Sequence, residues 1–261
     1  MQSRVSLEEL VTNITNLGFS SQDSNLVANN ILNKNILLLA LSGKLASGKD
    51  SLAYEAMNTL GHSDAVHVYF GDSIKGEVDQ IIALISSREG TVDFFVREVE
   101  SEQGVSSDYI VEIVNLLLLE KNNSNLHTAR DRTASMRRVL QLWGTEVRRQ
   151  QDPLYWVNKT LKTALSWACK GKSVYLTDAR FPNEVTPAQS VGFVVVRVEI
   201  SKETQEARLL SRDGIAVDLK AITHSSEVAL DGYSGFDIVI DNNAEFGETL
   251  KMLTKEIENI L

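Results

Sequence analysis

The chain of 261 residues is poor in cysteine and proline, with one cysteine and three prolines. A single cysteine excludes an internal disulfide, so a reducing compartment such as the cytoplasm is expected. We therefore predict that Cys169 is a buried free thiol.

Long apolar runs and runs of like charge are also missing. The longest apolar runs, residues 36–41 and 116–119, are far shorter than the roughly 20 residues that a membrane-spanning helix needs. The sequence therefore predicts no membrane span. The formal net charge is −9, and no long block of like charge occurs, so we expect no direct binding to nucleic acid.

Hydrophobic residues make up 43% of the chain, which is enough for a substantial core. Residues 1–35 carry apolar positions at helical spacing and predict an N-terminal helical extension of two helices. Its role stays open between contact in an oligomer, such as a homodimer, and plain packing. The main domain is expected over residues 36–261.

Apolar segments with β propensity recur along the main domain, at residues 36–41, 65–70, 173–177, 192–198 and 236–240. The first is apolar throughout, which is typical of a strand buried on both faces of a parallel sheet. Helical stretches separate the segments, so we predict an α/β fold with a five-stranded parallel sheet flanked by helices. Residues 72–152 are nearly all helical in pattern and are predicted to form a helical insertion.

The strongest motif, GKLASGKDS at residues 43–51, directly follows the first apolar segment and precedes a helical run. It fits GxxxxGK in its strand–loop–helix setting. Glycines let successive N–H groups face one anion, and the helix N-terminus adds its positive end. Lys49 is then expected to reach the β and γ phosphates of ATP. The motif thus predicts a phosphate loop that includes Gly43, Ser47 and Gly48.

The motif leaves two candidates for the metal ligand of this loop. Asp50 stands where such loops usually have the Ser or Thr that binds Mg²⁺, and a hydroxyl comes one place later, at Ser51. We predict that Asp50, directly or through water, or Ser51 contacts the metal.

Polar residues 177–184 (TDARFPNE) follow the third apolar segment. Ligands of open α/β sheets gather at the carboxyl ends of strands. Asp178 is expected to hold a Mg²⁺-bound water or the partners of an acceptor phosphate, and Arg180 to bind an anionic substrate. The alternative is an ordinary turn with a surface ion pair.

Residues 130–149 contain six arginines in an otherwise acidic protein. On a helix Arg137, Gln141 and Thr145 share one face, and Gly144 there would let a ligand approach the backbone. This stripe suits a phosphate and a base edge, whereas the alternative is a solvated basic face balanced by acidic neighbours. For Trp156, stacking on a nucleotide and packing in the core are equally open, and Trp143 is assigned to packing.

Residues 202–230 are predicted to form a lid, with a charged helix that carries Arg208 followed by a loop through His224. Phosphoryl transfer favours a mobile cover with positioned charge, although an ordinary exposed helix and loop is equally open. Asn242 follows the last apolar segment in a turn that either lies along a nucleotide base or caps the next helix.

These motifs together resemble the phage deoxynucleoside monophosphate kinases, which are P-loop kinases related to adenylate and phosphomevalonate kinases. The resemblance rests on SGKDS at 47–51, RRVLQLWGTEVRRQQDPLYWV at 137–157, TDARFPNE at 177–184, HSSE at 224–227 and DIVIDNN at 237–243. It implies transfer of a phosphoryl group from ATP to a deoxynucleoside 5'-monophosphate (dNMP), with Mg²⁺, for DNA precursor supply in the host cytoplasm. Asp50 looks usual for this family, and the extension 1–35 lies outside the resemblance.

The resemblance also implies site residues. ATP and Mg²⁺ would be bound at Ser47, Lys49, Asp50 and Ser51, and the acceptor would be held by Arg137, Arg138, Gln141, Gly144, Thr145, Trp156, Asp178, Arg180 and Glu184. We further expect Lys49, Arg137, Asp178 and Arg180 to be catalytic, and Arg208 and Asn242 to join the phosphate loop in binding ATP. Two other functions stay open: a kinase of another small phosphorylated metabolite, such as a phosphomevalonate-like one, and a regulatory nucleotide-binding protein without transferase activity.

Overall fold

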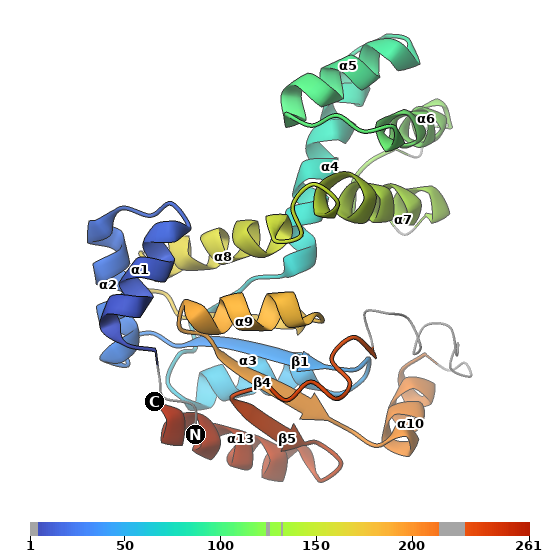
Figure 1. Cartoon of the computed structure of the whole chain (residues 1–261). Helices are drawn as coiled ribbons and strands as arrows, with labels where there is room; N and C mark the ends of the chain where they lie inside the picture. Colours follow the sequence, from blue (N-terminus) through green and yellow to red (C-terminus); the bar gives the residue numbers. More distant parts are fainter. Residues whose placement is uncertain (1–4, 124–125, 132, 214–227) are drawn as a thin grey trace. The chain divides into compact units, whose positions relative to one another are not determined.

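The structure is a computed structural model that describes residues 5–123, 126–131, 133–213 and 228–261 (Figure 1). The chain divides into two compact units. Met1–Tyr69 and Thr160–Leu261 form the first, which we name the sheet unit, and Phe70–Lys159 form the second, which we name the helical unit.

The sheet unit is built on five parallel strands in the order β2-β3-β1-β4-β5. Their bounds are β1 Leu38–Gly43, β2 Val66–His67, β3 Val174–Ala179, β4 Val194–Glu199 and β5 Ile238–Asp241. The predicted fold class, an α/β fold with a five-stranded parallel sheet flanked by helices, is confirmed.

The second predicted strand, residues 65–70, is wrong in extent. β2 contains only Val66 and His67. The amide of Val68 still donates to the Tyr175 carbonyl at 3.0 Å, but Phe70 already begins the helix α4. The apolar run therefore contains both a short edge strand and the buried first residue of a helix. Over so few residues the apolar pattern of a strand cannot be told from that of a buried helix.

Helices cover both faces of the sheet (Figure 1). The helices α3 (Lys49–Thr59) and α13 (Phe246–Ile260) lie on one face and α9 (Pro182–Ser190) lies on the other. Side chains alternate between the faces along a strand, so Leu37, Leu39 and Leu41 join α3 and α13 in one core cluster. Both faces of β1 are therefore buried, which explains its uninterrupted apolar sequence. Among the described residues this unit also contains α10 (Lys202–Asp213) and the later part of α8 (Tyr155–Ala168).

The N-terminal extension consists of α1 (Leu7–Asn16) and α2 (Ser21–Leu32). Ser6 and Glu9 form a capping box that begins α1. Gly192, with φ +96°, precedes β4, and a Cβ there would lie 3.2 Å from Leu10 and 3.0 Å from Ile31. The extension therefore packs closely against the turn that leads into β4.

The helical unit has its own apolar core, which includes Val78, Phe95, Val99 and Ile113. Trp143 is fully buried in it, as predicted. Its elements are α4 (Phe70–Ser87), α5 (Val92–Gln103), α6 (Tyr109–Asn122), α7 (Ala134–Gln141), the π-helix η1 (Leu142–Arg149) and the first part of α8. The arginine-rich segment predicted to be helical thus begins as the α-helix α7 and continues as the π-helix η1.

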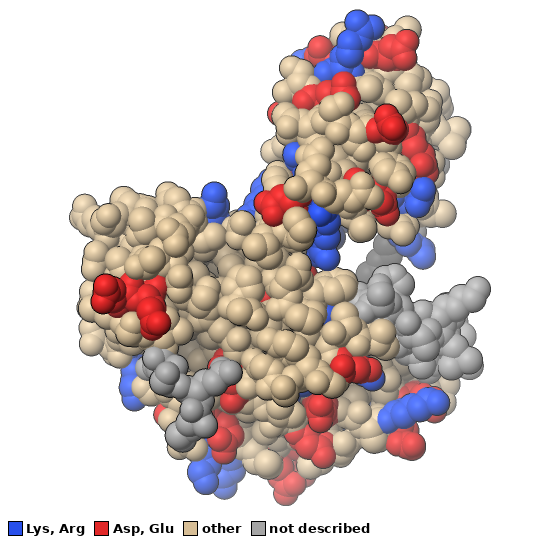
Figure 2. Space-filling model, in the orientation of Figure 1, with Lys and Arg blue, Asp and Glu red and all other residues tan. Residues whose placement is uncertain are grey.

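Acidic and basic side chains are interspersed on the face shown in Figure 2, with no continuous basic patch on it. Across the described residues, no helix is long and apolar enough to cross a membrane. Cys169 is a half-buried free thiol whose pKa is raised by burial and by the charge of Asp23.

Candidate functional site

The phosphate loop connects β1 to α3, and its backbone needs glycine at two positions. Gly48 adopts φ +81° as the N-cap of α3, a left-handed conformation that L side chains rarely adopt. A Cβ on Gly43 would lie 2.5 Å from the Ser47 hydroxyl and 2.8 Å from the Val198 carbonyl. Ala46 also has a positive φ of +61°, so the loop holds a strained residue that is not glycine.

Lys49 is the first residue of α3, where the helix has its positive end. The residue is only 8% exposed, and its Nζ lies 4.0 Å from the Asp50 carboxylate. A cation at a helix N-terminus that follows a left-handed glycine is the arrangement that binds phosphate groups in loops of this kind. The predicted phosphate loop therefore has a suitable geometry.

The carbonyl groups of this loop are bound by side chains from elsewhere in the sheet unit. Gln205 donates to the Leu45 carbonyl at 2.9 Å, and Asn242 donates to the Ser47 carbonyl at 2.7 Å. Arg208 reaches the carbonyls of Ala46 and Ser47 at 3.5 and 3.4 Å, and also donates to the Asn242 carbonyl at 2.8 Å.

Two of these side chains, Arg208 and Asn242, are predicted site residues, and the structure places both against the loop backbone. Gln205 was missed, although its spacing of three residues from Arg208 puts it on the same face of α10. α10 begins the predicted lid. Residues 214–227, with His224, lie outside the described residues.

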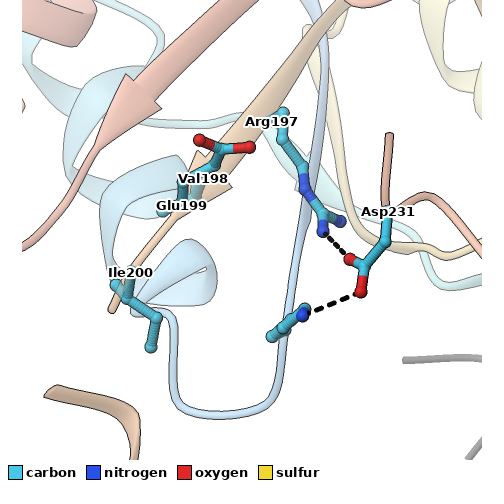
Figure 3. A pocket seen from close by; sticks show the side chains of 6 residues that line it. Arg197, Val198, Glu199, Ile200 and Asp231 are labelled. Atoms are coloured by element: carbon cyan, nitrogen blue, oxygen red, sulfur yellow. Dashed lines mark hydrogen bonds and ion pairs between the residues drawn. The ribbon is translucent and has the colours of Figure 1, made fainter. Parts of the chain in front are cut away.

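The start of the loop is linked through Asp231 to a buried arginine, Arg197, which sequence reasoning also missed (Figure 3). Asp231 accepts from Lys44 at 2.9 Å and from Arg197 at 3.2 Å. Arg197 is 6% exposed and also donates to the Ser42 hydroxyl at 3.1 Å. A pocket of about 250 Å³ lies beside the loop. It is lined by Lys44, Arg197, Val198, Glu199, Ile200 and Asp231.

The candidate metal ligand Asp50 is exposed and is oriented by a hydrogen-bond chain. Its Oδ1 accepts from the Thr177 hydroxyl at 2.6 Å, and the same hydroxyl lies 2.9 Å from His67 Nε2. Because Thr177 has one proton and donates it to Asp50, the Nε2 of His67 is the donor to Thr177. His67 is in turn stacked on Tyr175, with ring centroids 4.2 Å apart.

The oxygen ligands available here suit Mg²⁺. Ser51, the second candidate, is exposed next to Asp50 in the first turn of α3. Within the described residues no group of three or more His, Cys, Asp or Glu could hold a metal ion. Mg²⁺ is commonly bound through one or two protein oxygens together with phosphate oxygens and water, so Asp50 and Ser51 fit the metal's requirements.

The carboxyl end of β3 lies beside the start of the phosphate loop. Ala179 is paired with Ser42, the residue before the loop, so Asp178 and Arg180 lie on either side of this pairing along the chain. Both residues are half-buried. Glu184 is 3% exposed, and its carboxylate accepts from the backbone amides of Arg180 at 2.7 Å and Phe181 at 3.1 Å. Glu184, predicted to bind the acceptor, therefore fixes the turn that presents Arg180.

In the helical unit the predicted stripe of Arg137, Gln141 and Thr145 is exposed. Arg138 instead forms an exposed ion pair with Glu112 at 2.9 Å. The hydrogen bond that Arg138 donates to Glu112 raises the pKa of Arg138. One arginine of the predicted set is thus balanced by an acidic neighbour, whereas the stripe has the exposure that a ligand site needs.

Gly144 and Trp156 do not have that exposure. Trp156 is 1% exposed, and its indole N–H donates to the Gly144 carbonyl at 2.8 Å. A Cβ on Gly144 would lie 3.3 Å from Ile74. The space beside Gly144 is therefore filled by side chains instead of being open to a ligand, and of the two interpretations of Trp156 the structure shows core packing.

In the helical unit, sequence reasoning missed a buried carboxylate, that of Glu77. The residue is 2% exposed and accepts from Trp143 and Arg148 at 2.9 Å each, and from Tyr155 and Lys159 at 2.5 Å each. Its place between apolar residues of α4 was a usable signal, because an acid on an apolar face needs partners.

The same contacts shift two pKa values. Burial alone would raise the pKa of Glu77, but the hydrogen bonds from Lys159 and Tyr155 and the charge of Arg148 outweigh it, so the pKa lies below its ordinary value. Burial and the hydrogen bond to Glu77 raise the pKa of Tyr155 to about 12. Glu77 is therefore ionised, and Tyr155 neutral, across the neutral pH range.

Comparisons with known proteins give no family. No protein-family model matches the sequence, and no curated protein matches it. The crystal structure of TT1252 from Thermus thermophilus is similar, with a TM-score of 0.48 and 14% identity over 87% of this chain and 98% of that one. Dephospho-CoA kinase from Campylobacter jejuni is similar with a TM-score of 0.40 and 15% identity, again over 87% of this chain and 98% of that one. Both scores are below 0.5, so the function of this chain has to be inferred from its own site.

Proposed function

We propose that this chain is a P-loop kinase that transfers the terminal phosphoryl group of ATP to a deoxynucleoside 5'-monophosphate. The observation that carries the proposal is the phosphate loop. A left-handed Gly48 leads into α3, and Lys49 stands at the positive end of that helix. Such a site binds the tail of a nucleoside triphosphate.

The residues around the loop suit phosphoryl transfer. The transition state spreads negative charge over the phosphoryl oxygens, so positioned cations supply most of the catalysis. Lys49 would bind the β and γ phosphates, while Asp178 and Arg180 stand at the end of the neighbouring strand. A phosphate acceptor is already ionised at neutral pH, so a general base is not required.

Bound Mg²⁺ would neutralise charge that develops on the phosphate oxygens. Asp50 and Ser51 supply the oxygen ligands for it. The hydroxyl of Thr177 orients one Asp50 oxygen and leaves the carboxylate exposed. The metal ligand is thereby held in place before the nucleotide arrives.

The choice of a nucleotide acceptor rests on the sequence resemblance and on the exposed stripe of the helical unit. Arg137 offers a cation for a phosphate, and Gln141 and Thr145 offer an amide and a hydroxyl for a base edge. All three side chains are exposed. A product of this reaction is a deoxynucleoside diphosphate, a precursor for DNA synthesis.

The proposal is tested by measuring ADP release from ATP with dAMP, dGMP, dCMP, dTMP and phosphomevalonate as acceptors. We expect ADP release with at least one dNMP, and its loss in Lys49→Ala and in Arg180→Ala with the fold intact. Lys255→Ala, on the exposed face of α13, is the matched control and should keep full activity.

The other outcomes separate the alternatives. If phosphomevalonate were the only acceptor phosphorylated, the kinase assignment would stand and the dNMP acceptor would be replaced by another phosphorylated metabolite. ATP binding without phosphorylation of any acceptor would indicate a regulatory nucleotide-binding protein. Full activity of Lys49→Ala would contradict the assigned phosphate site.

A further inference from the structure

Three successive carbonyls of the phosphate loop, those of Leu45, Ala46 and Ser47, are bound by side chains of Gln205, Arg208 and Asn242. We name these three side chains the carbonyl clamp. Gln205 and Arg208 come from α10, and Asn242 follows β5.

The clamp determines which way the loop amides face. No peptide bond of the described chain is cis, and in a planar trans peptide the carbonyl and the following N–H point in opposite directions. Fixing the carbonyls of Leu45 and Ser47 therefore turns the amides of Ala46 and Gly48 away from the clamp. Two amides directed to one side make a concavity that suits an anion.

The loop needs such support because its conformation is unfavourable on its own. Ala46 has φ +61°, a conformation that persists in a residue with a side chain only where its surroundings impose it. Among the described residues, the Ser47 hydroxyl and the side-chain amide oxygen of Asn242 are buried and lack a hydrogen-bond partner. Strain and missing hydrogen bonds thus coincide at the part of the loop that the clamp holds.

Gln205 is buried, at 6% exposed, and its amide donates to the Leu45 carbonyl. The loop carbonyl also fixes the orientation of the amide group, because an amide oxygen facing it would be repelled. Gln205 therefore supports the part of the loop directly before the strained Ala46.

We propose that Gln205 is a positioning residue of the phosphate loop. By binding the Leu45 carbonyl it keeps the loop amides directed at the triphosphate tail of ATP, without contacting the nucleotide itself. The identity of this anion rests on the proposed function. A role in the folding of α10 alone is the competing explanation.

The first test measures dissociation constants for ATP and for inorganic tripolyphosphate, which has no base, by calorimetry. Gln205→Leu removes the donor and keeps an apolar stem, so we expect both ligands to bind about fivefold to tenfold more weakly. Gln205→Glu, which places an acceptor against the carbonyl, should weaken both further. Glu206→Gln, on the exposed part of α10 next in sequence, is the matched control and should bind as the wild type does.

A rescue experiment separates positioning from folding of the helix. Glycine adopts a positive φ readily. Adding Ala46→Gly to Gln205→Leu should therefore raise the affinity for both ligands about threefold above that of Gln205→Leu alone. If Gln205→Leu acted only by disturbing the folding of α10, Ala46→Gly in the loop would not restore the affinity. Hydrogen exchange of the loop amides in the unliganded protein should rise in Gln205→Leu and stay unchanged in Glu206→Gln.

The outcomes distinguish the two proposals. Unchanged binding of both ligands and unchanged exchange in Gln205→Leu would overturn the role of Gln205 and leave the proposed function standing. Weaker binding of ATP with unchanged binding of tripolyphosphate would also overturn it, because the effect would then act through the base. A wild-type protein that binds neither ligand would remove both proposals.

Discussion

The phosphate loop of the sheet unit and the Glu77 network of the helical unit both concentrate polar groups, but they satisfy them differently. The side-chain oxygens of Ser47 in the loop and of Asn242 beside it are buried and have no partner among the described residues, and Ala46 is strained. Around Glu77, four donors converge on one carboxylate. Unsatisfied and strained groups are typical of binding sites, whereas a saturated buried network stabilises a fold.

This difference gives separate expectations for the two regions. Changes at the loop should reduce ligand binding with small effects on the free energy of unfolding. Changes at Glu77 should reduce the stability of the helical unit, because a buried charge that loses its partner has a large desolvation penalty.

The largest expected effect is that of Glu77→Gln. The substitution leaves the 7% exposed Arg148 side chain without its counter-charge, so we expect a loss of about 3–5 kcal/mol in the free energy of unfolding. Urea unfolding followed by tryptophan fluorescence measures it. Glu112→Gln, in the exposed pair with Arg138, is the matched control and should cost less than about 1 kcal/mol. Equal losses in the two variants would contradict the assigned role of Glu77.

A smaller effect is expected for Tyr155→Phe, about 1.5–3 kcal/mol, because Tyr155 donates a hydrogen bond to a charged group. It also has a pH signature. The folded pKa of about 12 lies above the ordinary 10.0, so this contribution is complete below pH 10 and is lost as the pH rises towards 12. Stability curves from pH 8 to 12 should show the alkaline loss in the wild type and a smaller one in Tyr155→Phe. Superimposable slopes would argue against the contact.

The pKa of Glu77 is shifted in the opposite direction, so its contribution to stability is lost at low pH. Its folded pKa lies below the ordinary 4.5, so its contribution is present above that pH and is lost as the pH falls through the folded value. Glu77→Gln should therefore flatten the acid side of the stability curve, which the same urea series measures.

In the sheet unit, Thr177→Val should act on metal use more than on stability. The variant keeps the shape of the side chain and removes the hydroxyl that orients Asp50. We expect the Mg²⁺ concentration needed for half-maximal ATP binding to rise about tenfold. Thr177→Ser retains a hydroxyl and should restore most of the wild-type value. A normal Mg²⁺ requirement in Thr177→Val would show that the contact with Asp50 is not needed.

The smallest effect is expected for Arg138→Ala, whose guanidinium pairs with Glu112 at the surface. The loss of stability should stay below about 1 kcal/mol, and the KM for the accepted dNMP should hardly change. Arg137→Ala on the exposed stripe is the matched variant and should raise that KM severalfold. A larger rise in Arg138→Ala than in Arg137→Ala would reverse the assignment of the two arginines.

The sequence predicted the parts of the molecule that depend on short stretches of chain. The strand–loop–helix setting of residues 43–51 is one such part, since its glycines, Lys49 and the start of α3 lie within nine residues. The apolar run of β1 indicated burial on both faces. In contrast, the donors to Glu77 stand 66 to 82 residues away, and Gln205 stands 160 residues from Leu45. Such contacts depend on how the folded elements come together, which residue spacing does not specify.

Some predicted roles changed for the same reason. The spacing of Gly144 suggested an open backbone, but Ile74 of another helix fills that space. Trp156 and Glu184 lie within the motifs that predicted the acceptor site, and both are buried. A motif thus locates a region well, while the packing of distant residues decides which of its side chains remain accessible.

The most direct measurement for the account as a whole is calorimetric titration of ATP, with Mg²⁺, into the wild type and into Lys49→Ala. The cation at the start of α3 should bind the phosphates through charged hydrogen bonds, so we expect an affinity about tenfold to a hundredfold lower in the variant, with unfolding unchanged. Equal affinity of the two proteins for ATP would contradict the phosphate loop as the nucleotide site.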